Sequence, residues 1–262
     1  MNDIVAAFHK YFEIVDVNSE ELLREVFHLR YRVLCVEENI PGFEASNFLE
    51  EIEKDHYDDH SAHILLRHRP SDSFVGTARV ILHNTENPRA LFPTEQYTQF
   101  YPEFTNIINL SRRHTGEISR LVILAKYSKY RVDRRKSRSI VNTEKRIKED
   151  RRIFPHLILG LATGIIKLCA EHNIIHWLSS MNPATNRLLG FYGLQLDAIG
   201  PPAEFHGIRK PYYANLSDVM SRMYLNHREI WELVTNDGRF WPKALERRQI
   251  SRIPMQEITA NY

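Results

Sequence analysis

Two short apolar segments with the composition of buried strands are separated by a long apolar helical segment, and this pattern restricts the fold more than any other part of the sequence. The first strand segment is EISRLVIL at residues 117–124, and the second is IIHWLSS at residues 174–180. Between them, one helix face is formed by Ile158, Leu161, Ile165 and Leu168. Because a helix that connects two strands runs back along the sheet, these strands are expected to be parallel.

The remaining elements complete an α/β pattern. Apolar residues at helical spacing predict a helix over residues 19–38 that begins near Ser19. Segments 62–68 and 74–82 are rich in strand formers, are separated by turn residues, and predict a hairpin. We further expect a mostly irregular connection at 83–116, a short helix at 182–193 and a strand at 194–200. This order predicts an α/β fold with a mixed central sheet flanked by helices.

The length of 262 residues is compatible with one large domain and an appendage. We expect the main domain at residues 1–217, with a basic insertion at about 126–152. A helical C-terminal extension is expected at residues 218–262.

The strand at 117–124 carries two charged residues, Glu117 and Arg120. Strict alternation places them on opposite faces of the sheet. An ionised group in an apolar sheet costs several kcal/mol unless it is paired, so each requires a partner or a function. The simplest alternative is structural: Glu117 lies at the exposed start of the strand and Arg120 pairs with a carboxylate.

Other charged residues lie close to predicted strands or on the first predicted helix. They are Arg30, Asp55, Asp58 and Arg79. Taken singly, each is explained by a solvated charge or a structural ion pair, so the spacing alone assigns no function.

The ordered set of these residues resembles a known family. Arg30 is followed by DHYD at 55–58, GTAR at 76–79 and EISR at 117–120. This order resembles acyl-homoserine-lactone synthases and, more closely, long-chain N-acyl amino acid synthases and the acyltransferases associated with PEP-CTERM/exosortase systems. All are similar to GNAT-fold N-acyltransferases. The resemblance covers roughly residues 20–215, and its most specific element is E-x-S-R preceded about forty residues earlier by G-x-x-R.

The resemblance implies a GNAT-like fold that holds an acyl thioester in a V-shaped cleft between two splayed parallel strands. An amine attacks the thioester, and a carboxylate near the cleft removes the proton of the ammonium form; Glu117 is the candidate base. Tyr192 is the candidate acid for the leaving thiolate, with core packing as its alternative. The residues implied to form a charged network at the amine substrate are Arg30, Asp55, Asp58, Arg79 and Arg120.

Two departures from the lactone synthases bear on the substrate. Those enzymes carry aromatic residues where this sequence has Leu34 and Ile40, which argues against S-adenosylmethionine. A lactone synthase that uses S-adenosylmethionine stays as the alternative function. The pyrophosphate-binding signature of coenzyme A-dependent GNAT enzymes is missing from residues 125–156.

Charge is segregated along the chain. Residues 126–152 hold twelve Lys or Arg and four Asp or Glu, a net charge of +8. This segment is either a solvated insertion or a docking surface, for which an acidic acyl carrier protein is the favoured partner and coenzyme A phosphates are another. Nucleic acid is less favoured, because no nucleic-acid-binding motif accompanies the basic run. A non-enzymatic binding module that uses this segment is therefore a third hypothesis.

Composition limits the remaining chemistry. Cys35 and Cys169 do not form a disulfide framework, and His172 and His176, which are four residues apart, lack the rest of a zinc motif. No signal peptide and no apolar run of about 20 residues is recognisable. We therefore expect a cytoplasmic enzyme with no transmembrane segment, no metal and no bound cofactor, which uses an acyl carrier protein thioester or acyl-CoA as co-substrate.

Overall fold

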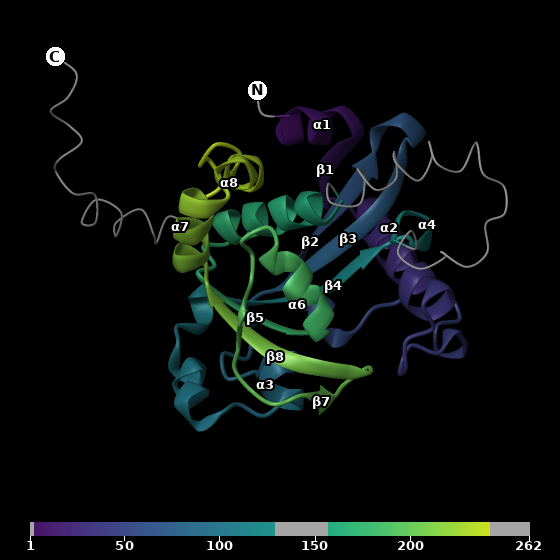
Figure 1. Cartoon of the computed structure of the whole chain (residues 1–262). Helices are drawn as coiled ribbons and strands as arrows, with labels where there is room; N and C mark the ends of the chain where they lie inside the picture. Colours follow the sequence, from purple (N-terminus) through teal and green to yellow (C-terminus); the bar gives the residue numbers. More distant parts are fainter. Residues whose placement is uncertain (1–2, 129–156, 242–262) are drawn as a thin grey trace, which may run out of the picture.

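A twisted mixed sheet forms the centre of the protein in a computed structural model that describes residues 3–128 and 157–241 (Figure 1). Within these residues, seven strands follow the order β1-β2-β3-β4-β5-β8-β6, and β7 pairs with β8. β4 and β5 are parallel, as the helical connection predicted, and the other described pairs are antiparallel. The strands are β1 (Phe12–Asp16), β2 (Ser61–His68), β3 (Ser73–Ile81), β4 (Thr115–Ile123), β5 (His176–Met181), β6 (Asp197–Ala198), β7 (Ala203–Glu204) and β8 (Ile208–Asn215).

Helices cover both faces of this sheet. They are α1 (Asp3–Tyr11), α2 (Glu20–Tyr31), α3 (Pro93–Tyr97), α4 (Ala125–Ser128), a helix at 157–171, α6 (Pro183–Gly190), α7 (Leu216–Asn226) and α8 (Arg228–Thr235). α2 begins where Ser19 accepts a hydrogen bond from the Leu22 amide, and it continues as a π-helical turn at Arg32–Glu37. The predicted helix at 19–38 is therefore present, with a change of pitch after Tyr31.

The two faces of the sheet belong to different apolar clusters. The front face, which carries the helix at 157–171 in Figure 1, includes Ile64, Ile118 and Trp177 in the largest cluster. The rear face carries α2, whose cluster includes Leu65 and Val122, and a smaller cluster around α3. Alternate residues of one strand thus serve separate cores, which explains the nearly continuous apolar sequence of these strands.

A β-bulge in β4 overturns the prediction that Glu117 and Arg120 face opposite ways. Arg79 is opposite Ser119 and Thr77 is opposite Val122, so β4 holds one extra residue in this interval. Arg120 adopts a left-handed φ of +51°. Its guanidinium pairs with Asp55 on the rear face of the sheet, where Arg79 also binds Asp55 and donates a hydrogen bond to Ser119. The bulge therefore brings both charged side chains of EISR to one side of the sheet.

The C-terminal helices do not stand apart from the sheet. α7 and α8 contribute Val219, Met223 and Leu233 to the front-face cluster, and α8 also contacts α1. The predicted strand at 194–200 is reduced to the two residues of β6, and α1, β1 and β8 were not predicted.

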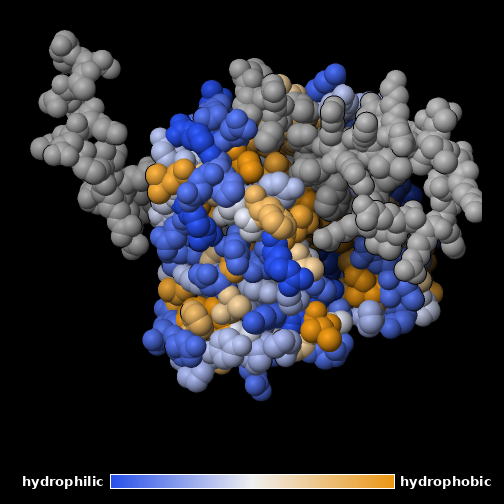
Figure 2. Space-filling view, viewed as in Figure 1, coloured by the Kyte–Doolittle hydropathy of each residue, from blue (hydrophilic) through white to orange (hydrophobic). Residues whose placement is uncertain are grey.

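The surface on the side shown in Figure 2 is mostly polar. On the side that Figure 2 shows, apolar residues form small groups between larger polar areas. No helix in residues 3–128 and 157–241 is long and apolar enough to cross a membrane.

Candidate functional site

A cleft opens where two parallel strands separate. β4 and β5 pair only through Thr115, Gly116 and Glu117, opposite His176, Trp177 and Leu178. At the point of separation the Ser179 hydroxyl donates a hydrogen bond to the Ile118 carbonyl across the gap. The space beyond it has a volume of about 1200 Å³ and passes between the two strands. This is the V-shaped cleft that the sequence resemblance implied.

The front side of the cleft is apolar. Side chains from β5, the helix at 157–171, α6 and the segment that follows α6 line it, and all belong to the front-face cluster or pack against it. These residues are Ile158, Ala162, Ile165, Trp177, Leu188, Leu189, Leu194 and Leu196. Such a lining suits a hydrocarbon chain and offers few partners to a charged ligand.

The rear side of the cleft is polar, and Glu117 lies at its base. The carboxylate is 2% exposed and accepts a hydrogen bond of 2.8 Å from the Thr94 amide in the first turn of α3. Burial raises the pKa of Glu117 to about 7, although the Thr94 hydrogen bond and the charge of Arg79 act in the opposite direction. Near neutral pH this group can both accept and hold a proton.

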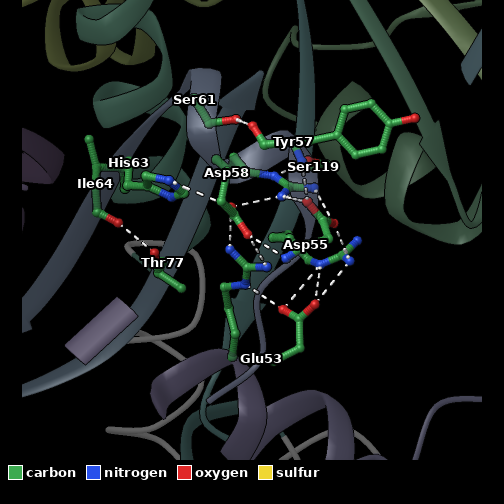
Figure 3. Close-up of polar contacts among 12 residues, drawn as sticks. Glu53, Asp55, Tyr57, Asp58, Ser61, His63, Ile64, Thr77 and Ser119 are labelled. Carbon is green, nitrogen blue, oxygen red and sulfur yellow. Dashed lines mark hydrogen bonds and ion pairs between the residues drawn. The ribbon is translucent and has the colours of Figure 1, made fainter. Parts of the chain in front are cut away.

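Beside Glu117, three arginines and three carboxylates form a buried network (Figure 3). Arg30 comes from α2, is fully buried, and pairs with Glu53 at 2.5 Å and with Asp58 at 2.7 Å. Burial by itself lowers the pKa of Arg30, but the Glu53 and Asp58 carboxylates more than offset this and raise it. The guanidinium therefore stays charged and fastens α2 to the rear of the site.

Arg79 and Arg120 complete the network. Arg79 binds both oxygens of Asp55 at 2.6 and 3.1 Å, contacts Asp58 at 2.8 Å, and donates to the Ser119 hydroxyl. Arg120 bridges Glu53 at 3.0 Å and Asp55 at 2.8 Å. Burial raises the carboxyl pKa values of Asp55 and Asp58, but the arginines more than reverse this and hold both below their ordinary values. Three positive and three negative groups thus neutralise one another.

Local structure explains why DHYD can supply two carboxylates to this network. Asp55 caps the turn at His56–His60 by accepting from the Tyr57 amide, and Asp58 accepts from the Asp55 amide. The reciprocal hydrogen bonds fix both side chains on one side of the turn. Figure 3 shows the Tyr57 ring pointing away from the carboxylates.

Aromatic rings line the rear side of the cleft. Tyr97 stacks on Phe205 with ring centroids 4.5 Å apart, Phe205 contacts His206 at 4.6 Å, and His206 contacts Phe43 at 4.4 Å. The guanidinium of Arg120 lies 4.8 Å from the Phe43 ring centre. We call these four rings the aromatic arch; all four line the cleft and join α3, the β7–β8 connection and the loop before Phe43.

The structure brings six of the seven sequence-predicted site residues together. Asp55, Arg79, Glu117 and Arg120 line the rear of the cleft, and Arg30 and Asp58 lie behind them in the same network. Tyr192 follows α6, packs against the front-face cluster and does not line the cleft. Its position agrees with core packing, the alternative weighed from the sequence. Burial raises the pKa of Tyr192.

Sequence reasoning missed Glu53, which pairs with both Arg30 and Arg120. It lies in the acidic run EEIEKDHYDD, where neighbouring glutamates are exposed, so composition did not distinguish it. Leu34 and Ile40 both line the cleft. Most of the basic insertion lies outside the described residues. Within the described residues, no group of three or more His, Cys, Asp or Glu side chains is placed to hold a metal.

Comparison with known proteins assigns this architecture. Residues 29–136 match the family model of the acetyltransferase (GNAT) domain. The fold is GNAT-like. The match and the fold indicate an acyltransferase, although none of the curated proteins matches the sequence significantly.

Solved structures share the fold at low identity. TofI, in a ternary complex with an inhibitor and MTA, is 15% identical with a TM-score of 0.51, over 84% of this chain and 99% of that one. The CoA-dependent acyl-homoserine lactone synthase BjaI, with SAM and isopentyl-CoA, is 18% identical with a TM-score of 0.50, over 82% and 89%. FeeM, an N-acyl amino acid synthase from uncultured soil microbes, is 11% identical with a TM-score of 0.46, over 83% and 97%. At these identities the likeness concerns the fold.

Proposed function

We propose that this protein is an N-acyltransferase that moves a long-chain acyl group from an acyl thioester to the amine of an amino acid or similar small molecule. One observation carries the proposal: the buried carboxyl of Glu117 lies at the strand split, where a polar rear side and an apolar front side of one cleft meet. The acyl chain occupies the front side and the amine approaches from the rear.

Glu117 acts as the general base in this proposal. Its carboxylate takes a proton from the ammonium group, directly or through one water, since a protonated amine has no lone pair for attack. The neutral amine then attacks the thioester carbonyl carbon and a C–N bond forms. The C–S bond breaks, and the leaving thiolate takes the remaining extra proton from the nitrogen, so that a neutral amide and a free thiol are released. In the described register, β4 has no β5 partner beyond Glu117, so strand amides there are candidate donors to the developing oxyanion.

The five network residues that were predicted from the sequence, together with Glu53, position the site in this proposal. Arg30, Asp55, Asp58, Arg79 and Arg120 hold α2 and the turn at His56–His60 against β3 and β4. Because the network is neutral and its donors are paired, it supplies a rigid wall beside Glu117. Tyr192 is left without a catalytic role, because it does not line the cleft.

Acyl carrier protein is the proposed donor, with acyl-CoA second. The supporting observations are the +8 charge of residues 126–152, which complements an acidic carrier, and the missing pyrophosphate signature. The association with exosortase systems is a prediction about neighbouring genes that follows from the sequence resemblance alone.

The second candidate is a lactone synthase that uses S-adenosylmethionine. The shared fold with BjaI is compatible with it. Leu34 and Ile40 weigh against it, because both line the cleft at positions where the sequence resemblance expects aromatic residues.

Product analysis tests the proposal. The purified protein is incubated with long-chain acyl carrier protein or acyl-CoA and pooled amino acids, with S-adenosylmethionine in a parallel reaction, and small molecules are identified by mass spectrometry. An N-acyl amino acid supports the proposal and names donor and acceptor. A lactone formed only with S-adenosylmethionine supports the second candidate, and thioester hydrolysis without any acylated amine contradicts both.

A further inference from the structure

Arg209 is a cleft-lining cation that the charged network does not use. It lies in β8, is half-buried, and lines the same cleft as Glu117 and Arg120. Within residues 3–128 and 157–241, no carboxylate is within ion-pair distance of its guanidinium, in contrast to Arg30, Arg79 and Arg120. A guanidinium of this kind is an available site for an anion.

The register of β8 places Arg209 on the rear side of the cleft. Tyr213 packs against the smaller rear-face cluster around α3. Pro211 is opposite Ser180, whose hydroxyl lies 2.9 Å from that of Thr94 in α3, so this position also faces the rear. Because side chains alternate along a strand, Arg209 shares this face. β8 runs antiparallel to β5, so residue 209 lies toward the end at which β4 and β5 have separated.

The surroundings of Arg209 favour a planar anionic group. Burial lowers the pKa of Arg209, and the nearest opposing charges, the exposed carboxylates of Glu38 and Glu204, do not offset this. A carboxylate bound in the cleft would compensate the buried charge and accept two parallel hydrogen bonds from the guanidinium. His206 of the aromatic arch, three residues before Arg209 in the chain, lines the same cleft.

We propose that Arg209 binds the carboxylate of the acceptor, so that the acceptor class is an amino acid rather than an uncharged amine or amino alcohol. This inference rests on the proposed function, because the bound amine is an acyl acceptor only in that reaction. It narrows the class of substrate that binds at the same site. Arg209 is then a specificity-determining residue, with no part in proton transfer.

Equilibrium binding of two probes, one with a carboxylate and one with an uncharged amide, tests the inference without turnover. N-decanoylglycine and N-decanoylglycinamide differ only in the carboxylate, and calorimetric titration of the full chain gives both affinities. A charged hydrogen-bonded pair predicts that the wild-type protein binds the acid about tenfold or more tightly than the amide. In R209Q the preference for the acid should fall to about threefold or less with amide binding unchanged, and R209K should be intermediate, because lysine keeps the charge but lacks the fork.

K210Q is the matched control. Lys210 is the next residue of β8, is opposite Met181, and is not among the residues that line the cleft, so the variant changes the net charge equally on the other face. It should keep the preference. The inference is overturned if wild-type protein binds neither probe, if it binds both equally, or if R209Q keeps the preference. It is also overturned if K54Q, at the exposed cleft-lining Lys54, abolishes the preference instead.

These outcomes separate the inference from the proposed function. Selective binding of the acid through Arg209 without any N-acyl product in the mass-spectrometric assay contradicts the function and supports the inference. N-acylation of uncharged amines as efficiently as of amino acids supports the function and overturns the inference.

Discussion

At residue 117 two influences act in opposite directions on one carboxyl group. Burial disfavours the charged form, while the Thr94 amide and Arg79 favour it, and burial prevails to give a pKa of about 7. A carboxyl at an ordinary pKa would be a weaker base toward an ammonium group. The proposed role of Glu117 as a base thus depends on its buried position under α3, which raises the pKa, as well as on the presence of a carboxyl group.

Glu117→Gln should lower turnover by about a hundredfold or more, since the amide cannot accept the proton. The wild-type rate should rise as pH increases through about 7, when Glu117 loses its proton, and the residual rate of the variant should lack this step. Initial rates between pH 6 and 9, with separate measurement of thioester binding, check both statements. Glu232→Gln, on the exposed side of α8, is the control. Unchanged turnover of Glu117→Gln across this range excludes Glu117 as the base.

Most of the individual residues of the site, but not all of them, could be predicted from the sequence. The five network residues and Glu117 were predicted through a motif resemblance, which records the positions of side chains without giving their partners. Glu53 could not be found, because its role depends on a loop that returns it to Arg30 and Arg120.

Glu53→Gln should lower the free energy of unfolding by about 3–5 kcal/mol, because it leaves two buried arginines with one carboxylate fewer. Urea denaturation measures the change. Asp72→Asn removes a carboxylate that is 82% exposed from its pair with Arg67 and should cost about 0.5 kcal/mol or less. Equal effects of the two substitutions would contradict a stabilising role for the network.

At the scale of elements, the helix at 157–171 packs unusually close to the sheet. A Cβ atom at Gly164 would lie 2.8 Å from Ile64 Cγ1, and one at Gly160 would lie 2.7 Å from Phe8. The four-residue spacing of Gly160 and Gly164 therefore reflects packing against α1 and β2.

Gly164→Ala should destabilise the protein, because overpacking of about 1–3 kcal/mol outweighs the gain of about 1 kcal/mol in helix propensity. Glu171→Ala, on the exposed end of the same helix, should change stability by about 0.5 kcal/mol or less. Thermal and urea denaturation of both variants give the comparison. A more stable Gly164→Ala variant would show that the helix can move away from Ile64.

Elements were predicted well where periodicity was strong and poorly where it was interrupted. The hairpin of β2 and β3 and the parallel pair of β4 and β5 follow from apolar patterning and a helical connection. β8 was missed because its eight residues, IRKPYYAN, include a proline, two cations and two tyrosines, a composition that does not identify a central strand. The bulge at Arg120 was missed because alternation assumes a regular register.

At the scale of the whole molecule, the described residues share one main core. The front-face cluster runs from Phe8 in α1 to Val234 in α8, so both ends of the described chain contribute to it. The predicted boundary after residue 217 falls inside the first turn of α7, a helix that contacts β8 directly.

Leu233→Ala in α8 should lower the stability of the entire protein by about 2–5 kcal/mol, because the side chain is 3% exposed within the main cluster. Unfolding should stay a single transition by far-UV circular dichroism and by tryptophan fluorescence. Leu225→Ala, at a side chain that is 78% exposed, is the matched control and should have little effect. A separate early transition in Leu233→Ala would instead identify the C-terminal helices as an independent unit.

The bulge in β4 also limits which sequences this molecule can tolerate. Position 120 combines a left-handed backbone, which glycine adopts most readily, with a side chain that bridges Glu53 and Asp55. Glycine satisfies the first requirement and fails the second, whereas lysine keeps a charge but cannot span both carboxylates with a rigid fork. In a library of all single substitutions we therefore expect residue 120 to accept no replacement, although Leu121, Val122 and Ile123, the apolar residues that follow it, can exchange with one another.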